Sequence, residues 1–263
     1  MNKAANAFVS RIVLLLSLVI SINSQALHEG EKNGSAATWE MNRKAIQLVG
    51  EKKFQEAIEV LKNALAIDPN YSTAYMNLGT AYMLSGQTEI AVKHLNNALE
   101  IDPGSAVGHN QLGVAYEKLG KIDKAVASFN RAIKIKPDYA FGYFNLGATY
   151  LWADKIKPAR EALEISLRLE PLNDQAQMLL GVVYARQSKY ADAVRQMKNI
   201  TQKDPSNEMA NLLLCQIYVL SNDRGAALDM YQRYKGVNET LADAMFRTIF
   251  AGRVVFAKTE LQH

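Results

Sequence analysis

Residues 106–139 read AVGHNQLGVAYEKLGKIDKAVASFNRAIKIKPDY, and this 34-residue stretch is one of a series of similar stretches. Five of the six prolines are spaced by 34 residues: Pro69, Pro103, Pro137, Pro171 and Pro205. A fixed period of about 20 to 50 residues is typical of stacked repeat architectures. We divide the series into six units without insertions: 38–71, 72–105, 106–139, 140–173, 174–207 and 208–241.

Other residue types recur with the same period. A small residue stands at Ala45, Gly79, Gly113, Gly147, Gly181 and Cys215. An alanine stands at Ala57, Ala91, Ala125, Ala159, Ala193 and Ala227, and a larger residue follows four positions later at Leu61, Leu95, Phe129, Leu163, Met197 and Tyr231. We expect the small residues to let two helices of a hairpin approach closely, and the large residues to fill the space between hairpins. Proline, which has no N–H, is expected to end the second helix.

In the third unit the order is His109, Leu112-Gly113, Tyr116, Ala125, Phe129 and Pro137. This order resembles the tetratricopeptide repeat (TPR), and the resemblance extends over residues 38–241. It implies an all-α fold, a right-handed superhelical solenoid of antiparallel helix hairpins. It also implies a protein that binds other proteins.

The amino-terminal segment differs from the repeats. Lys3 and Arg11 precede an uncharged stretch over 12–27, and Ser24-Gln25-Ala26 offers small residues for cleavage. This pattern predicts a signal peptide over 1–26 and export to the periplasm or medium. The alternative is an uncleaved membrane anchor. Residues 27–37 are read as a polar leader.

Residues 242–263 form the other end of the chain. A helix from about 241 to 258 is expected to cover the last repeat. Its apolar face is predicted to comprise Leu241, Ala242, Met245, Phe246, Ile249 and Phe250. Self-association through this helix is a second interpretation of its apolar surface.

The residues offer little support for catalysis. The histidines are His28, His94, His109 and His263, none at a metal-ligand spacing, and no phosphate loop or nucleophile motif occurs. The single cysteine, Cys215, occupies a small-residue packing position, which predicts a buried thiol. The formal charge of +4 falls to +2 without residues 1–26, too little to indicate nucleic-acid binding. We therefore predict no enzyme, no metal and no cofactor.

The concave face lined by the first helix of each hairpin is the candidate site. The predicted peptide-groove residues are Met76, Asn77, Thr80, Asn110, Gln111, Val114, Phe141, Phe144, Asn145, Ala148, Trp152, Met178 and Val182. Side-chain amides can donate to and accept from the main chain of an extended peptide, and the apolar residues can hold its side chains. Two alternatives stay open. The amides can serve only to hold the hairpins, and a tightly curled array can bury the apolar residues.

Two classes of function follow. The first is a non-catalytic adaptor or scaffold of the cell envelope that binds peptide segments and assists the assembly of a complex. The second is a structural protein that associates with itself. An enzyme with an unrecognised site is the remaining alternative.

Overall fold

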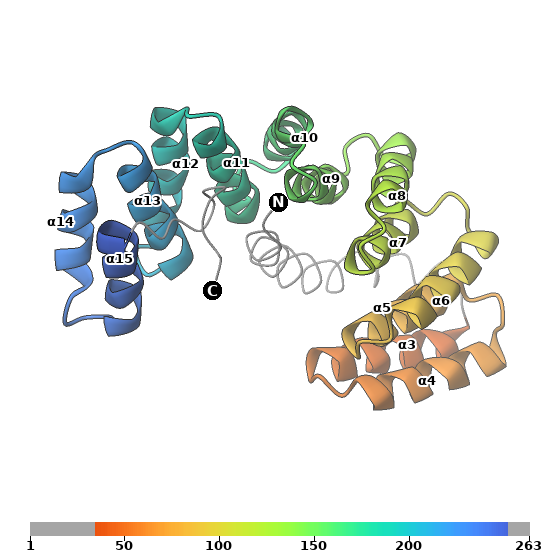
Figure 1. Cartoon of the computed structure of the whole chain (residues 1–263). Helices are drawn as coiled ribbons and strands as arrows, with labels where there is room; N and C mark the ends of the chain where they lie inside the picture. The colour runs from red at the N-terminus through yellow and green to blue at the C-terminus, as the bar shows by residue number, and fades with distance from the viewer. Residues whose placement is uncertain (1–34, 252–263) are drawn as a thin grey trace. The chain divides into compact units, whose positions relative to one another are not determined.

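The computed structural model describes residues 35–251, and all regular structure within them is α-helical (Figure 1). The helices are α3 (Ala36–Gly50), α4 (Phe54–Ile67), α5 (Ser72–Leu84), α6 (Thr88–Ile101), α7 (Ala106–Lys118), α8 (Ile122–Ile135), α9 (Ala140–Trp152), α10 (Ile156–Leu169), α11 (Asp174–Arg186), α12 (Tyr190–Lys203), α13 (Glu208–Leu220), α14 (Arg224–Tyr234) and α15 (Glu239–Ala251). Odd-numbered helices α3 to α13 are the first helices of the six hairpins, and the even-numbered helices are the second. The predicted signal peptide and residues 27–34 of the polar leader lie outside the described residues, and Ala36 and Ala37, which were assigned to the leader, begin helix α3.

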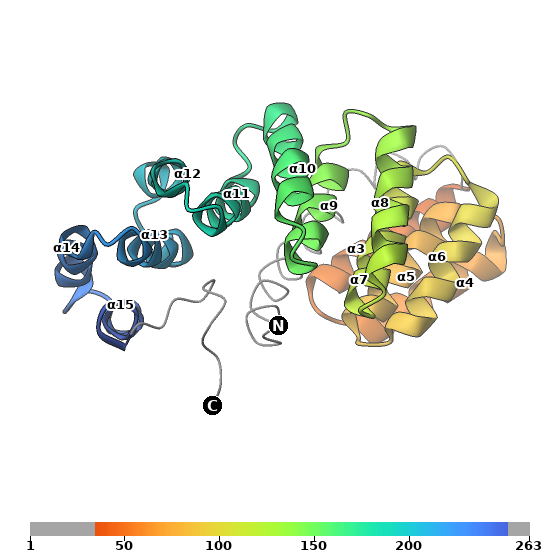
Figure 2. The same cartoon turned by 45° about the horizontal axis from the view of Figure 1, so that its top comes forward.

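Helices α3 to α8 pack on one another in chain order, and so do helices α10 to α15, as expected for stacked hairpins. The described chain divides into two compact units, residues 35–149 and 150–251. In the first unit α3 packs on α4, α5 on α6 and α7 on α8, and adjacent hairpins also touch. In the second unit α11 packs on α12, and α15 contacts both α13 and α14 (Figure 2). This consecutive packing confirms the predicted class of fold.

The small-residue position brings the two helices of a hairpin together. A Cβ added at Gly113 would lie 2.5 Å from Cε1 of Phe129, and one at Gly181 would lie 2.5 Å from Cε of Met197. A Cβ at Gly79 would lie 2.7 Å from Cγ of Leu95. The large residue of these units therefore lies directly against the glycine of its own hairpin. The sequence predicts this large residue in the space between hairpins. The structure instead shows it filling the space beside the glycine of its own hairpin.

The turn inside each hairpin has one residue with a left-handed backbone. Its φ is positive at the same position of all six units: Lys52, Gly86, Gly120, Asp154, Ser188 and Asn222. The next residue donates its N–H to a carbonyl five residues back, as Gln87 does to Tyr82 at 2.8 Å and Lys121 does to Tyr116 at 2.8 Å. This is the 6→1 bond of a Schellman motif. The recurring tyrosine position thus supplies the carbonyl that closes the first helix.

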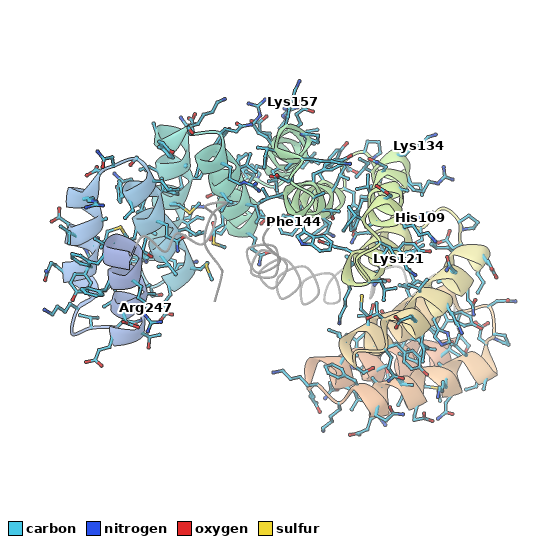
Figure 3. All side chains as sticks on the ribbon, viewed as in Figure 1. His109, Lys121, Lys134, Phe144, Lys157 and Arg247 are labelled. Carbon is cyan, nitrogen blue, oxygen red and sulfur yellow. The ribbon has the colours of Figure 1, made fainter. Side chains whose placement is uncertain are left out.

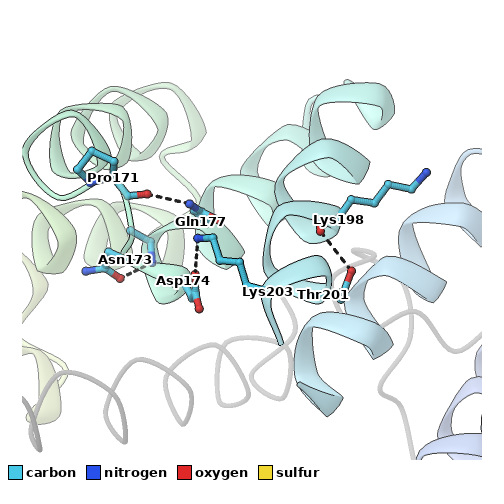
Figure 4. Close-up of polar contacts among 8 residues, drawn as sticks. Pro171, Asn173, Asp174, Gln177, Lys198, Thr201 and Lys203 are labelled. Atoms are coloured by element: carbon cyan, nitrogen blue, oxygen red, sulfur yellow. Dashed lines mark hydrogen bonds and ion pairs between the residues drawn. The ribbon is translucent and has the colours of Figure 1, made fainter. Parts of the chain in front are cut away.

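The turn between hairpins is held from the following helix. His109 Nε2 lies 3.1 Å from the carbonyl oxygen of Pro103, which suits a tautomer that donates there. Gln177 Nε2 donates to the carbonyl of Pro171 at 2.9 Å (Figure 4), and Asn211 Nδ2 donates to that of Pro205 at 3.0 Å. Three units therefore use the fourth residue of the first helix to fix the preceding proline turn.

The carboxy-terminal helix begins close to its predicted start, but its apolar face differs from the prediction. The described helix α15 begins at Glu239 because α14 has 11 residues, where α12 has 14. Leu241, Ala242, Met245 and Ile249 are buried, but Phe246 and Phe250 are exposed. The apolar face was therefore predicted too wide, since α13 and α14 cover only one side of it. Residues 252–258 of the expected helix lie outside the described residues.

Candidate binding face on the first helices

The predicted groove residues lie on four first helices. Within residues 35–149, α5 carries Met76, Asn77 and Thr80, α7 carries Asn110, Gln111 and Val114, and α9 carries Phe141, Phe144, Asn145 and Ala148. Trp152, Met178 and Val182 belong to the second compact unit. We call the surface formed by α3, α5, α7 and the part of α9 up to residue 149 the first-helix face.

Most of these side chains are buried. Phe141 and Trp152 are partly exposed, whereas Phe144 on α9 is 1% exposed (Figure 3). Phe141 packs against a cluster of Val107, Ala132 and Tyr139, with its ring centre 6.3 Å from that of Tyr139. Phe141 therefore contributes to the core as well as to the surface. Burial was the alternative expectation for the apolar residues, and their binding role stays a prediction.

The amides of this face pair with one another between units. Asn77 donates from Nδ2 to Oδ1 of Asn42 at 2.6 Å. Asn145 donates in the same way to Oδ1 of Asn110 at 2.9 Å. Each bond joins the fifth residue of one unit to the sixth residue of the next. Asn77, Asn110 and Asn145 were predicted as groove residues, but the pairing between units was not predicted.

Pairing leaves some amide atoms without a partner. Nδ2 of Asn110, Oδ1 of Asn145 and Oε1 of Gln111 are buried and make no hydrogen bond. If the side-chain O and N atoms of both asparagines were exchanged, the pair would again form one hydrogen bond. One donor atom and one acceptor atom are therefore left without a partner in either orientation. A buried donor or acceptor without a partner costs about 1–3 kcal/mol. Unpartnered donor and acceptor atoms therefore remain on α7 and α9.

Glu117 adds an acid to the same pair of helices. It is 7% exposed, and it is the only charged residue among the buried side chains of residues 35–250. Burial raises its pKa to about 7, while a hydrogen bond with Thr149 opposes that shift. The Thr149 hydroxyl donates to the carbonyl of Asn145 at 2.8 Å, so its oxygen is free only to accept. Thr149 can therefore lower the pKa of Glu117 only when its hydroxyl turns from the Asn145 carbonyl and donates to the carboxylate.

Glu117 was missed by the sequence analysis although the repeats contained a signal. The same position holds Val49, Met83, Leu151, Ala185 and Val219 in the other five units. A carboxyl group at a position that is otherwise apolar is an exception that the period makes visible. Position-by-position comparison of the units would have identified it.

The remaining reactive side chains are in packed surroundings. Cys215 is fully buried, and burial raises the pKa of its thiol to about 12. The His94 ring stacks on Tyr82 with ring centres 5.2 Å apart, and burial and nearby Lys62 lower its pKa. In the part of the chain that the structure describes, no group of three or more His, Cys, Asp or Glu could hold a metal ion. None of the described helices is long and apolar enough to cross a membrane.

Comparisons with known proteins agree with this architecture. Tetratricopeptide repeat family models match residues 48–109, 106–139 and 145–208. A search of curated proteins gave no match. Among solved structures, the chain is similar to MamA, with 27% identity over 61% of this chain and 94% of that chain and a TM-score of 0.54.

Two pilus proteins have a similar fold at lower identity. PilW, described as a widely conserved type IV pilus biogenesis factor, is 18% identical over 82% of this chain and all of that chain (100%), with a TM-score of 0.74. PilF of Pseudomonas aeruginosa is 19% identical over 84% of this chain and 95% of that chain, with a TM-score of 0.69. These two likenesses concern the fold alone.

The repeats, the helix hairpins and the family matches define a solenoid of the class that binds other proteins. The chain belongs to the tetratricopeptide repeat family. Members of this family are generally non-catalytic scaffolds for protein–protein interactions.

Proposed function

We propose that this protein is a non-catalytic adaptor that binds an extended segment of a partner protein on the first-helix face of residues 35–149. The observation that carries the proposal is the set of unpartnered amide atoms on adjacent first helices. Nδ2 of Asn110 is a free donor, and Oδ1 of Asn145 and Oε1 of Gln111 are free acceptors. A peptide main chain offers the complementary C=O and N–H groups in every residue.

Binding would satisfy the buried amides without requiring a particular partner sequence. The partner carbonyl accepts from Asn110 Nδ2, and the partner N–H donates to Asn145 Oδ1. The side chains over these atoms must move aside for the segment to enter. This movement costs free energy. New hydrogen bonds to the unpartnered amide atoms offset part of the cost, because the desolvation penalty of these atoms is already present in the free protein. Phe141, which is partly exposed, supplies apolar surface for the partner's side chains.

Glu117 adds a preference for charge. Within the first-helix face its carboxyl group has Thr149 as a hydrogen-bonding partner and no cation beside it. Above a pH of about 7 the group becomes a buried carboxylate, which gains from a paired cation. We therefore infer that the preferred segment carries a lysine or arginine near the Glu117 end of α7.

The amino-terminal pattern supports a site of action outside the cytoplasm. Lys3, Arg11, the uncharged stretch and the small residues before position 27 support export of the protein. We propose that it acts in the periplasm or outside the cell and assists the assembly of an envelope complex. The partner is then another exported protein.

A photocrosslinking residue at Phe141 tests the proposal in living cells. Phe141 is chosen because it is partly exposed at the edge of the face. A matched probe at Ile90, which is 37% exposed on the second helix α6, is the control. We expect the Phe141 probe to capture one or a few exported proteins that the Ile90 probe does not. Equal capture from both positions, or none from Phe141, would contradict the proposal.

A further inference from the structure

Helix α15 presents two exposed aromatic side chains beside a third from α14. Phe246 is 45% exposed and Phe250 is 61% exposed. Their ring centres are 4.6 Å apart, and the ring of Phe246 lies 5.9 Å from that of Tyr231. We call these three residues the α15 aromatic patch.

Phe246 packs partly on Tyr231 of α14, but most of the packing of α15 does not involve this patch. The opposite side of the helix provides that packing through Leu241, Met245 and Ile249, which are buried. Phe246 and Phe250 follow one another at i and i+4, so they lie on one face of the helix. Contiguous exposed apolar surface is uncommon on soluble proteins and marks interaction sites.

The charges beside the patch indicate what binds there. Asp243 and Arg247 are both exposed, and they form an i,i+4 ion pair within α15, from which Arg247 projects (Figure 3). A twofold interface brings the same surface of two copies together. If two α15 helices cross in antiparallel directions at Phe246, Arg247 of each copy comes within reach of Asp243 of the other. The charges of this surface are therefore complementary to those of a second copy.

We propose that the α15 aromatic patch is a self-association site, where two copies of this chain pair through Phe246 and Phe250. The exposed parts of the four phenylalanine rings amount to roughly 400 Å², far below the roughly 1,200 Å² of a stable interface. The pairing is accordingly weak and reversible, with a dissociation constant above about 10 μM. It does not depend on the first-helix face.

Cysteine crosslinking of the full-length protein tests this pairing. Cys215 is the single native cysteine, and its burial keeps it unreactive in the folded protein. An Arg247→Cys variant places a thiol near the proposed twofold axis. It removes the Asp243–Arg247 charge pair and keeps both phenylalanines, so its crosslinking rate measures pairing through Phe246 and Phe250. A Leu172→Cys variant places one on a residue that is 78% exposed in the turn after α10, away from α15. Mild oxidation should give disulfide-linked dimers of the first variant at least about ten times faster than of the second.

Adding Phe246→Ser and Phe250→Ser to Arg247→Cys should lower its crosslinking rate to that of Leu172→Cys. Far-UV circular dichroism should show unchanged helicity, because the buried residues Leu241, Met245 and Ile249 of α15 are kept. Similar rates for the two cysteine variants, or rates that do not respond to the serine substitutions, would overturn the proposal. All variants share the same amino-terminal segment, so association through that segment cancels in the comparison.

Discussion

Gly113 lies so close to Phe129 that the ring fills the space of a missing side chain. Three ring atoms of Phe129 would be within 2.9 Å of a Cβ on Gly113, and Phe129 itself is fully buried. The ring cannot turn away without opening the hairpin core.

We therefore expect Gly113→Ala to destabilise the protein by about 1–3 kcal/mol through overpacking. Thermal unfolding followed by circular dichroism measures the effect. Gly50→Ala is the matched control, because a Cβ there meets nothing within 4 Å. A melting temperature lowered equally by both substitutions would show that the close approach at Gly113 is unimportant.

At the left-handed turn position we expect a substitution that raises the stability of the protein instead of lowering it. Ser188 has a φ of 59°, although its side chain disfavours this region, whereas Gly120 has a φ of 70° without that penalty. Ser188→Gly should stabilise the protein by about 0.5–1 kcal/mol, and Gly120→Ala should destabilise it by a similar amount. Urea unfolding of the two variants checks both signs. Loss of stability in Ser188→Gly would mean that its side chain makes a compensating contact.

The repeat period predicted the fold, but it did not predict these turns. Prolines and small residues recur because one residue type fits each of their positions. The left-handed position holds glycine in two units only, Gly86 and Gly120, so its geometry recurs without a recurring residue. The backbone bond to the recurring tyrosine position imposes the conformation instead. A pattern search finds constraints on side chains more readily than constraints on the backbone.

The candidate site was predictable in part for a similar reason. The amides were identified from their types and positions. Their pairing was not, because Asn110 and Asn145 are 35 residues apart, one more than the period. Hydrogen bonds between the fifth residue of one unit and the sixth of the next cannot be read from residues that share a position. Their unpartnered atoms became apparent only with coordinates.

Glu117 makes stability depend on pH. Its pKa is raised from 4.5 in the unfolded chain to about 7 in the folded protein, so the folded state binds more protons in this range. The contribution is complete below pH 4.5 and is lost as the pH rises through about 7, a change of roughly 3 kcal/mol. Glu117→Gln should remove this dependence. Urea unfolding of both proteins between these pH values provides the test, and parallel curves would contradict the assignment.

Cys215 should be chemically silent in the native protein. It is fully buried and its pKa is raised to about 12, so the nucleophilic thiolate is scarce and inaccessible. A thiol reagent at neutral pH should react only after denaturant is added. A control variant with Leu172→Cys should react at once in the folded state. Rapid labelling of the native wild-type thiol would contradict the packing described for α13.

The most direct test of the binding account compares two matched amide substitutions. Asn110→Asp keeps the Oδ1 that accepts from Asn145 and removes the free Nδ2 donor. Asn42→Asp makes the same change in the equivalent pair with Asn77, where neither asparagine has a fully buried amide atom without a partner. Calorimetry should measure the affinity of each purified variant for the partner segment that the photocrosslinking probe at Phe141 captures. The account predicts a loss of about tenfold or more for Asn110→Asp and little change for Asn42→Asp. Equal affinities in the two variants would contradict it.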